Sequence, residues 1–241
     1  RYDHYLRFAL PFVGIVIAIS QTAPMLQLPL YFKLALGYGP LLATVALAPL
    51  FAALVLAGPV AGFLLTRFTP RWLVGAGVVA VGLGDLVLAL VMTTDATYLA
   101  FVIPCALVGA GFVIGTTVRT AIIFASVPRG LPATAAALNE ASILVGSRVG
   151  IVVVTSIVAQ VALATYTASV AALPPAEAAS AIGAFNDFLV AIGTPSFDQI
   201  ATAIGATDLQ PYADAYTAGV RAALALGGAA AVVAGIVALL A

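Results

Sequence analysis

Charged residues inside long apolar stretches are the first candidates for chemistry in this sequence. Arg119 and Glu140 each lie in such a stretch. A charge at membrane depth costs at least about 2.5–3.5 kcal/mol, so each one needs a partner or a function. With a rise of about 1.5 Å per helical residue, both lie roughly 10 Å from the same end of consecutive antiparallel helices. This predicts an ion pair, which is either a static structural contact or a gate contact that lets Glu140 exchange a proton on opening.

Asp85 and Arg148 are expected deeper, both roughly 18–21 Å from that end. Equal depth permits pairing but does not establish that the two side chains are adjacent. Asp85 either carries a proton or bonds backbone or water beside a partner helix, and Arg148 is a candidate contact for an anionic or polar substrate. Arg221 lies near the opposite surface and is expected to snorkel toward water.

Other reactive residue types are scarce. The single cysteine, Cys105, lies in an apolar run and is expected to fill the core, and the single histidine, His4, has no Cys or His partner. The sequence contains no recognisable nucleophile–base pairing and no Gly-x-Ser-x-Gly motif. We therefore expect no enzyme, no metal site and no other cofactor.

The composition determines which elements can position these groups. Hydrophobic residues make up 63% of the chain and charged residues 7%, and the mean hydropathy is +1.19. A typical soluble domain is about 45–50% apolar and about 25% charged, so the expected solvent is a lipid bilayer. The formal net charge is zero, which gives no indication of a nucleic-acid partner.

Six apolar runs are long enough to cross a bilayer as helices, because about 20 apolar residues span the hydrocarbon. The expected spans are Phe8–Tyr31, Leu41–Leu65, Leu73–Thr93, Tyr98–Val127, Ala135–Ala164 and Tyr216–Ala241. The fourth and fifth exceed the minimum, so we expect tilt or extension into the cytoplasm. The spans contain prolines at which kinks can form: Pro24, Pro29, Pro49, Pro59 and Pro104. The predicted fold is an all-α membrane bundle: helices one to five in 1–164, an outer loop in 165–214 and the sixth helix in 215–241.

The distribution of charge predicts an orientation. Arginines gather at one end of the spans (Arg1, Arg7, Arg67, Arg71 and Arg129), whereas acidic residues gather at the other. The positive-inside rule then places both ends of this segment in the cytoplasm. Spans one to three and four to six consequently have opposite orientations, as inverted-repeat transporters do.

The stretch from Thr165 to Asp214 is too polar to span. Pro174 and Pro175 followed by Glu177 indicate a helix start, and apolar residues at helical spacing follow. That stripe consists of Ile182, Phe185, Leu189 and Ile192, and a second short helix is expected near Ser196 with Ile200 and Ile204 on one face. We expect an amphipathic hairpin outside the cytoplasm, either lying on the membrane surface or capping the bundle.

The connector between spans two and three carries a recognisable motif. It reads Gly62-Phe-Leu-Leu-Thr66-Arg67-Phe-Thr69-Pro70-Arg71. This resembles the cytoplasmic signature Gly-x-x-x-Asp-Arg-x-Gly-x-Arg of the major facilitator superfamily, with Thr66 and Thr69 departing from it. Further segments resemble the fourteen-helix drug:proton antiporters in register: Leu28–Tyr31, Leu36–Pro40, Gly58–Gly62, Leu138-Asn139 with Gly146 and Gly150, and Asp214–Arg221.

The resemblance implies the carboxy-terminal six-helix half of a multidrug efflux transporter. The amino-terminal half and its proton-coupling acid would lie outside this sequence, and the opening at Arg1 and the end at Ala241 are what we expect of a piece of a longer chain. By family position the first span lines the central cavity, so Gln21, Gln27, Asn139 and Arg148 are candidate substrate contacts. For Gln21 and Gln27 the alternative is hydrogen bonding between helices.

The same resemblance makes Gly62, Arg67 and Arg71 a candidate cytoplasmic gate, with simple topology anchors as the alternative reading of the arginines. Asp85, Arg119 and Glu140 are candidates for proton coupling or ion pairing. The expected function is proton-coupled efflux of drugs or small organic metabolites by alternating access, in the bacterial cytoplasmic membrane. The rival functions are a six-span protein that dimerises as a transporter or channel, and a non-transporting membrane assembly factor.

Overall fold

The described part of the chain is a bundle of long helices. The computed structural model describes residues 2–94, 96–126, 132–192 and 209–240, and the regular elements in them are all helical. The helices are α1 (Tyr2–Leu34), α2 (Pro40–Val45), α3 (Ala48–Leu65), α4 (Pro70–Val91), α5 (Leu99–Ser126), α6 (Pro132–Ser169), α7 (Pro175–Ala191) and α9 (Gln210–Leu240). Six helical segments are long and apolar enough to cross a membrane, with α2 and α3 together forming the second. The six expected spans are therefore confirmed.

Proline breaks the second span. The helix stops at Val45 and resumes at Ala48, with Pro49 in the first turn of α3. Pro49 has no N–H and its ring disturbs the preceding turn, which is why the expected kink becomes a break. The Ala46 carbonyl at the break accepts a hydrogen bond of 3.3 Å from the Tyr98 hydroxyl, just before α5. Partial burial at this position raises the pKa of Tyr98 above its usual value.

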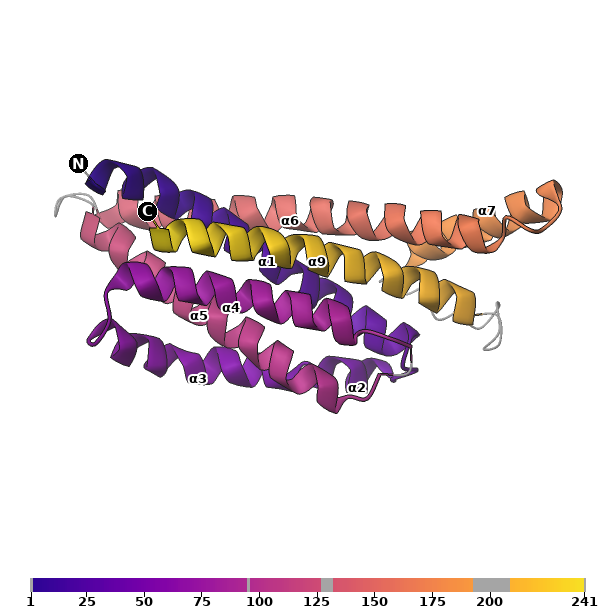
Figure 1. Ribbon diagram of the computed structural model, residues 1–241, viewed down its shortest axis with the longest axis horizontal. Coiled ribbons are helices and arrows are strands. Elements are labelled where there is room, and N and C mark those ends of the chain that lie inside the picture. The colour runs from indigo at the N-terminus through magenta and orange to yellow at the C-terminus, as the bar shows by residue number, and fades with distance from the viewer. Residues whose placement is uncertain (1, 95, 127–131, 193–208, 241) are drawn as a thin grey trace.

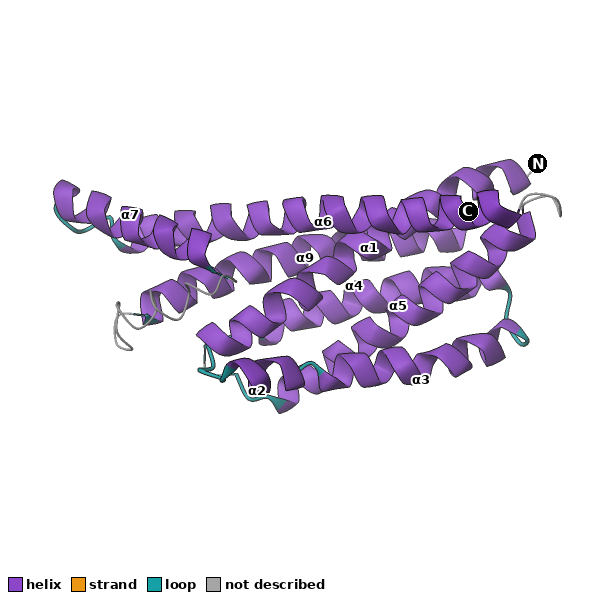
Figure 2. Ribbon diagram, turned by 180° about the vertical axis from the view of Figure 1, so that it is seen from behind, coloured by secondary structure: helices purple, strands orange, loops and turns teal. Residues whose placement is uncertain are grey.

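The helix contacts relate two triplets of spans. The first triplet consists of α1, α2 with α3, and α4, and the second consists of α5, α6 and α9. The second helix of each triplet packs against the first helix of the other: α3 contacts α5, and α6 contacts α1. The third helices follow the same rule, because α4 contacts α5, α9 contacts α1, and α4 and α9 contact each other. Figures 1 and 2 show α3 and α6 at opposite edges and the two marked chain ends at one end of the bundle. Two triplets of opposite orientation, related by a pseudo-two-fold axis, produce this exchange of partners.

Glycines allow the central helices to pack backbone against backbone. A Cβ built on Gly82 of α4 would lie 2.5 Å from the carbonyl oxygen of Gly228 in α9. On the other side of α4, a Cβ on Gly77 would lie 2.7 Å from the backbone nitrogen of Gly115 in α5. No real side chain tolerates such distances, so α4 fits between α5 and α9 only because these positions lack a Cβ.

The helix α6 is much longer than the hydrocarbon requires. Its 38 residues extend about 57 Å at 1.5 Å per residue, against about 30 Å of hydrocarbon. Figure 1 shows the excess, together with α7, projecting beyond α4 and α5 at the end away from the chain termini. Much of the length of α6 beyond the hydrocarbon thickness therefore lies at the end away from the chain termini. Its helix runs on past Ala164 to Ser169 because α7 packs against that part.

Aromatic residues join α7 to the projecting part of α6. The Tyr166 and Phe185 rings stack with centroids 4.3 Å apart, and Phe188 and Tyr212 meet edge to face at 5.1 Å. The helix begins at Pro175, as expected, and Ile182, Leu189 and Ile192 of the expected stripe pack against this cluster. The second short helix expected near Ser196 lies outside the described residues, as do Arg1, Arg129 and residues 193–208.

Substitution of Gly82 by alanine should loosen the bundle. The added methyl group would meet the Gly228 carbonyl and the backbone nitrogen of Val232, and overpacking of this kind costs about 1–3 kcal/mol. The matched control is Gly183→Ala in α7, where the residue is exposed, a Cβ meets nothing within 4 Å and the change in helix propensity favours alanine by up to about 1 kcal/mol. Thermal unfolding midpoints in detergent micelles should fall for Gly82→Ala and stay or rise for Gly183→Ala. Equal midpoints would contradict the close packing of α4 and α9.

Candidate functional site

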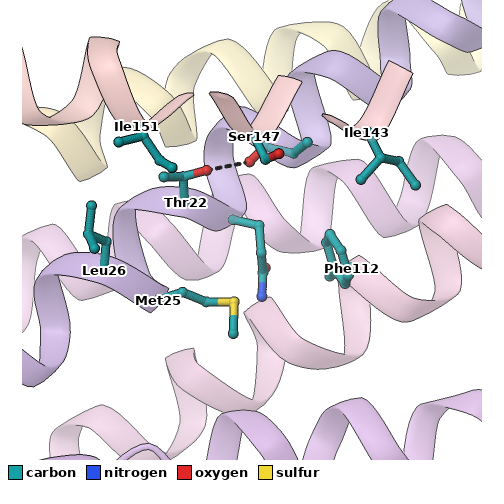
Figure 3. A pocket seen from close by; sticks show the side chains of 9 residues that line it. Thr22, Met25, Leu26, Phe112, Ile143, Ser147 and Ile151 are labelled. Atoms are coloured by element: carbon teal, nitrogen blue, oxygen red, sulfur yellow. Dashed lines mark hydrogen bonds between the residues drawn. The ribbon is translucent and has the colours of Figure 1, made fainter. Parts of the chain in front are cut away.

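A cavity of about 330 Å³ lies between α1, α5 and α6 and opens to one side. Figure 3 shows its lining, in which Met25, Phe112 and Ile143 come from three different helices. The full lining is Ala18, Gln21, Thr22, Met25, Leu26, Phe112, Ile143, Ser147 and Ile151. The volume is within the range of small-molecule sites, about 300–1,000 Å³. Apolar side chains with a few polar groups make the lining suited to a largely apolar molecule.

The polar groups of the lining differ in their availability. The Thr22 hydroxyl donates to the Ala18 carbonyl at 2.8 Å, and the Ser147 hydroxyl donates to the Leu144 carbonyl at 3.0 Å. Both hydroxyl hydrogens are therefore used within their own helices. By contrast, Oε1 of Gln21 is buried and has no hydrogen-bond partner in the described part of the chain. A buried amide oxygen without a partner costs free energy, so Gln21 is the least satisfied polar residue of this lining.

The other three expected cavity residues do not line this cavity. Gln27 is buried and its Oε1 accepts a hydrogen bond from the Tyr216 hydroxyl, which joins α1 to α9. Gln27 therefore takes the alternative role considered above, a hydrogen bond between helices. Oδ1 of Asn139 accepts a hydrogen bond from Arg119. Arg148 is exposed on α6, and neither it nor Asp85 has an ion-pair partner among the described residues.

Arg119 is fully enclosed, with 0% of its surface exposed. Its Nη2 donates to Oδ1 of Asn139 and its Nη1 donates to Oγ of Ser142, both at 2.8 Å. Oδ1 of Asn139 also accepts from the Thr120 hydroxyl at 3.1 Å. The ion pair expected with Glu140 is not formed: both residues are described, yet Glu140 is exposed. The α6 turn presents Asn139 and Ser142, three residues apart, on one face, and Glu140 points elsewhere.

A glycine makes room for this arginine. A Cβ built on Gly14 of α1 would lie 2.2 Å from Nη1 of Arg119, so the guanidinium lies directly on the α1 backbone. Sequence reasoning missed Asn139 and Ser142 as partners of Arg119, Thr120 as a second donor to Asn139, and Gly14 as the position that leaves room for the guanidinium. The signal was present in the spacing Asn139-x-x-Ser142, since residues i and i+3 share a helical face.

The three candidate gate residues lie near the end of the bundle that holds the chain termini. Nη2 of Arg71 donates to the Leu239 carbonyl at 3.0 Å and so binds the C-terminal end of α9. Carbonyls in the last turn of a helix lack intrahelical partners, and the helix dipole favours a cation there. Arg67 lies over the Phe63 ring, with its guanidinium carbon 5.6 Å from the centroid. Gly62 is exposed, and a Cβ there would meet nothing within 4 Å.

The fold is that of an all-helical protein with six candidate membrane-spanning helices. Within the described residues, no group of three or more His, Cys, Asp or Glu side chains could hold a metal ion. No protein-family model matches the chain, and no curated protein matches it.

Removal of the Asn139 amide should destabilise the bundle. In Asn139→Ala the buried guanidinium loses an acceptor, and a hydrogen bond to a charged group contributes about 1.5–3 kcal/mol. Asn186→Ala in α7 is the matched control, because Asn186 is exposed and surface substitutions change stability by within about 0.5 kcal/mol. Thermal unfolding in detergent should separate the two variants. A loss no larger than that of the control would show that Asn139 does not hold Arg119.

Proposed function

We propose that this chain is one half of a proton-coupled secondary transporter of the major facilitator type, which exports amphipathic organic compounds by alternating access. The observation that carries the proposal is the one-sided cavity between α1, α5 and α6. In transporters built from inverted repeats, the substrate site lies near the middle of the membrane between two such bundles. A half-cavity that opens sideways from a six-helix bundle is what one of the two halves contributes.

The helix arrangement supports the same proposal. The partner exchange between the two triplets matches an inverted repeat, and α3 and α6 lie at opposite edges of the bundle. A Cβ added to most glycines of α4, α5 and α6 would collide with a neighbouring helix. By contrast, a Cβ added to Gly58 or Gly62 of α3 would meet nothing within 4 Å. Small residues four apart permit close helix packing. We assign this stripe of α3 to contact with the second half.

The substrate class follows from the lining. A molecule in the cavity would contact mainly apolar side chains, with Gln21, Thr22 and Ser147 as the polar residues of the lining. Within the described residues the lining contains no charged side chain, and neither Arg148 nor Glu140 belongs to it. These features favour a lipophilic compound over a small anion.

Arg71 supports the alternating-access part of the proposal. Its bond to the Leu239 carbonyl ties the start of α4 to the end of α9. In the related signature, such arginines bind helix ends in one state and release them in the other. The bond is exposed and therefore inexpensive to break, which suits a contact that must reopen in each cycle.

Filling the cavity should block transport. The complete protein that contains this chain would be reconstituted in liposomes, and movement of a fluorescent lipophilic amine would be followed under an imposed proton gradient. Ile143→Trp places a large ring in the cavity and should lower the initial rate at least about tenfold, which corresponds to about 1.4 kcal/mol. Val153→Trp is the control, because Val153 is exposed on α6 and lies two residues from Ile151, on the opposite helical face.

Two results would overturn the proposal. A complete protein that moves no solute under any imposed gradient is not a secondary transporter. Equal inhibition by Ile143→Trp and Val153→Trp would remove the cavity from the transport path. A third result would change the partner: if cysteines placed at Gly58 cross-link two copies of the chain, the partner of this half is a second copy of the same chain.

A further inference from the structure

Asp85 lies in the interior of the bundle, away from the proposed substrate cavity. It is 0% exposed, and neither of its carboxylate oxygens has a hydrogen-bond partner in the described part of the chain. A Cβ built on Gly228 of α9 would lie 3.0 Å from the Cβ of Asp85. An isolated carboxylate in such a place costs far more free energy than a neutral carboxyl group, which can also donate to a backbone carbonyl.

Among the described residues, the helices packed against α4 bring no cation to Asp85. Arg221 of α9 is tied to α4 one turn away, where its Nε donates to the Ala89 carbonyl at 2.9 Å. Arg119 of α5 is bound to Asn139 and Ser142. The hydroxyl of Tyr31, from α1, donates to the Thr93 carbonyl beyond the end of α4, and α3 contains no titratable residue. The remaining group is the thiol of Cys105 in α5, which is near enough to interact electrostatically with Asp85.

We infer that Asp85 is a proton-binding site in the interface of α4, α5 and α9, occupied while these helices are closed and emptied when they separate. The inference rests on the proposed transport function only in naming this proton as the coupled one. The binding of the proton itself follows from the burial of Asp85 and the lack of a counter-ion.

The packing links this proton to a movement of the two triplets. Gly82 and Gly228 bring the α4 and α9 backbones into contact one turn from Asp85, so water cannot reach the carboxyl group without separation of these helices. The two helices belong to different triplets. Loss of the proton places a charge in the interface and favours separation, whereas binding of the proton favours closure.

Infrared spectroscopy of the intact protein in membranes tests the protonation state directly. Near neutral pH, the spectrum should contain a carbonyl stretching band of a protonated carboxyl group that shifts in deuterated water and is absent in Asp85→Asn. Glu177→Gln removes an exposed carboxyl group from α7 and should leave that band unchanged. Retention of the full band in Asp85→Asn would overturn the inference.

The native thiol reports the linked movement. With Cys105 as the single cysteine of the intact protein, maleimide labelling should be slow in acidic buffer and accelerate as the pH rises. Opening that releases one proton becomes about tenfold more favourable per pH unit. The ratio of wild-type to Asp85→Asn labelling rates cancels the ionisation of the thiol, and this ratio should rise by about that factor. A ratio independent of pH would show that Asp85 does not control the opening.

Transport measurements separate this inference from the proposed function. Asp85→Asn should retain downhill exchange of the lipophilic amine and lose its accumulation under a proton gradient. If the infrared band and the labelling ratio behave as expected while no variant transports, the proton site stands and the proposed function fails. If transport occurs and the band persists in Asp85→Asn, the proposed function stands and the proton site fails.

Discussion

The absence of water from hydrocarbon is the constraint on which the whole bundle depends. Every buried polar group must find its partner within the protein or remain unpaired at a cost of several kcal/mol. Helices satisfy the backbone, and the side chains must then be satisfied across helices. Hydrogen bonds from side chains link α1, α4, α5, α6 and α9 in the described part of the chain. Tyr216 binds Gln27, Arg119 binds Asn139 and Arg221 binds a backbone carbonyl.

Close helix packing depends on the same constraint. Apolar side chains give no net advantage for one helix over lipid, so association depends on shape and on the approach of backbones. Gly82 and Gly228 bring α4 onto α9, and Gly14 lets the Arg119 guanidinium lie on α1. Because glycines let the helices approach closely, polar groups far apart in the sequence come within hydrogen-bond distance. A methyl group at any of these positions would separate the donors from their acceptors.

The sequence was sufficient for the existence and approximate limits of all six spans, because hydropathy acts locally along the chain. It also indicated the start of α7 at Pro175 and a possible kink at Pro49, where the structure has a break, but Pro59 and Pro104 lie inside continuous helices. It was not sufficient for partners across helices. Arg119 and Glu140 have matching depths, yet the rotation of α6 about its own axis turns Asn139 and Ser142 toward the arginine instead. The depth of a residue in the membrane follows from counting residues along its helix. The rotation of a helix about its own axis depends on its packing against several other helices at once.

The polar groups that remain unsatisfied are more informative about function than those that are bonded. Gln21 and Asp85 differ from Gln27 in that their side-chain oxygens have no partner in the described residues, whereas Oε1 of Gln27 accepts from Tyr216. Both lie beside α5: Phe112 of α5 lines the cavity beside Gln21, and Cys105 on the same helix face lies near Asp85. Phe112 and Cys105 are seven residues apart, two helical turns or about 10 Å along one helix.

A rigid helix between two sites can transmit a displacement from one to the other, provided that it has two discrete positions. Closure of α4 and α9 around a protonated Asp85 fixes α5 through its glycine contacts with α4. Deprotonation would release α5 and with it the Phe112 wall of the cavity. In the proposed transporter, proton and solute would therefore not need to compete for one site, because the position of α5 would depend on both.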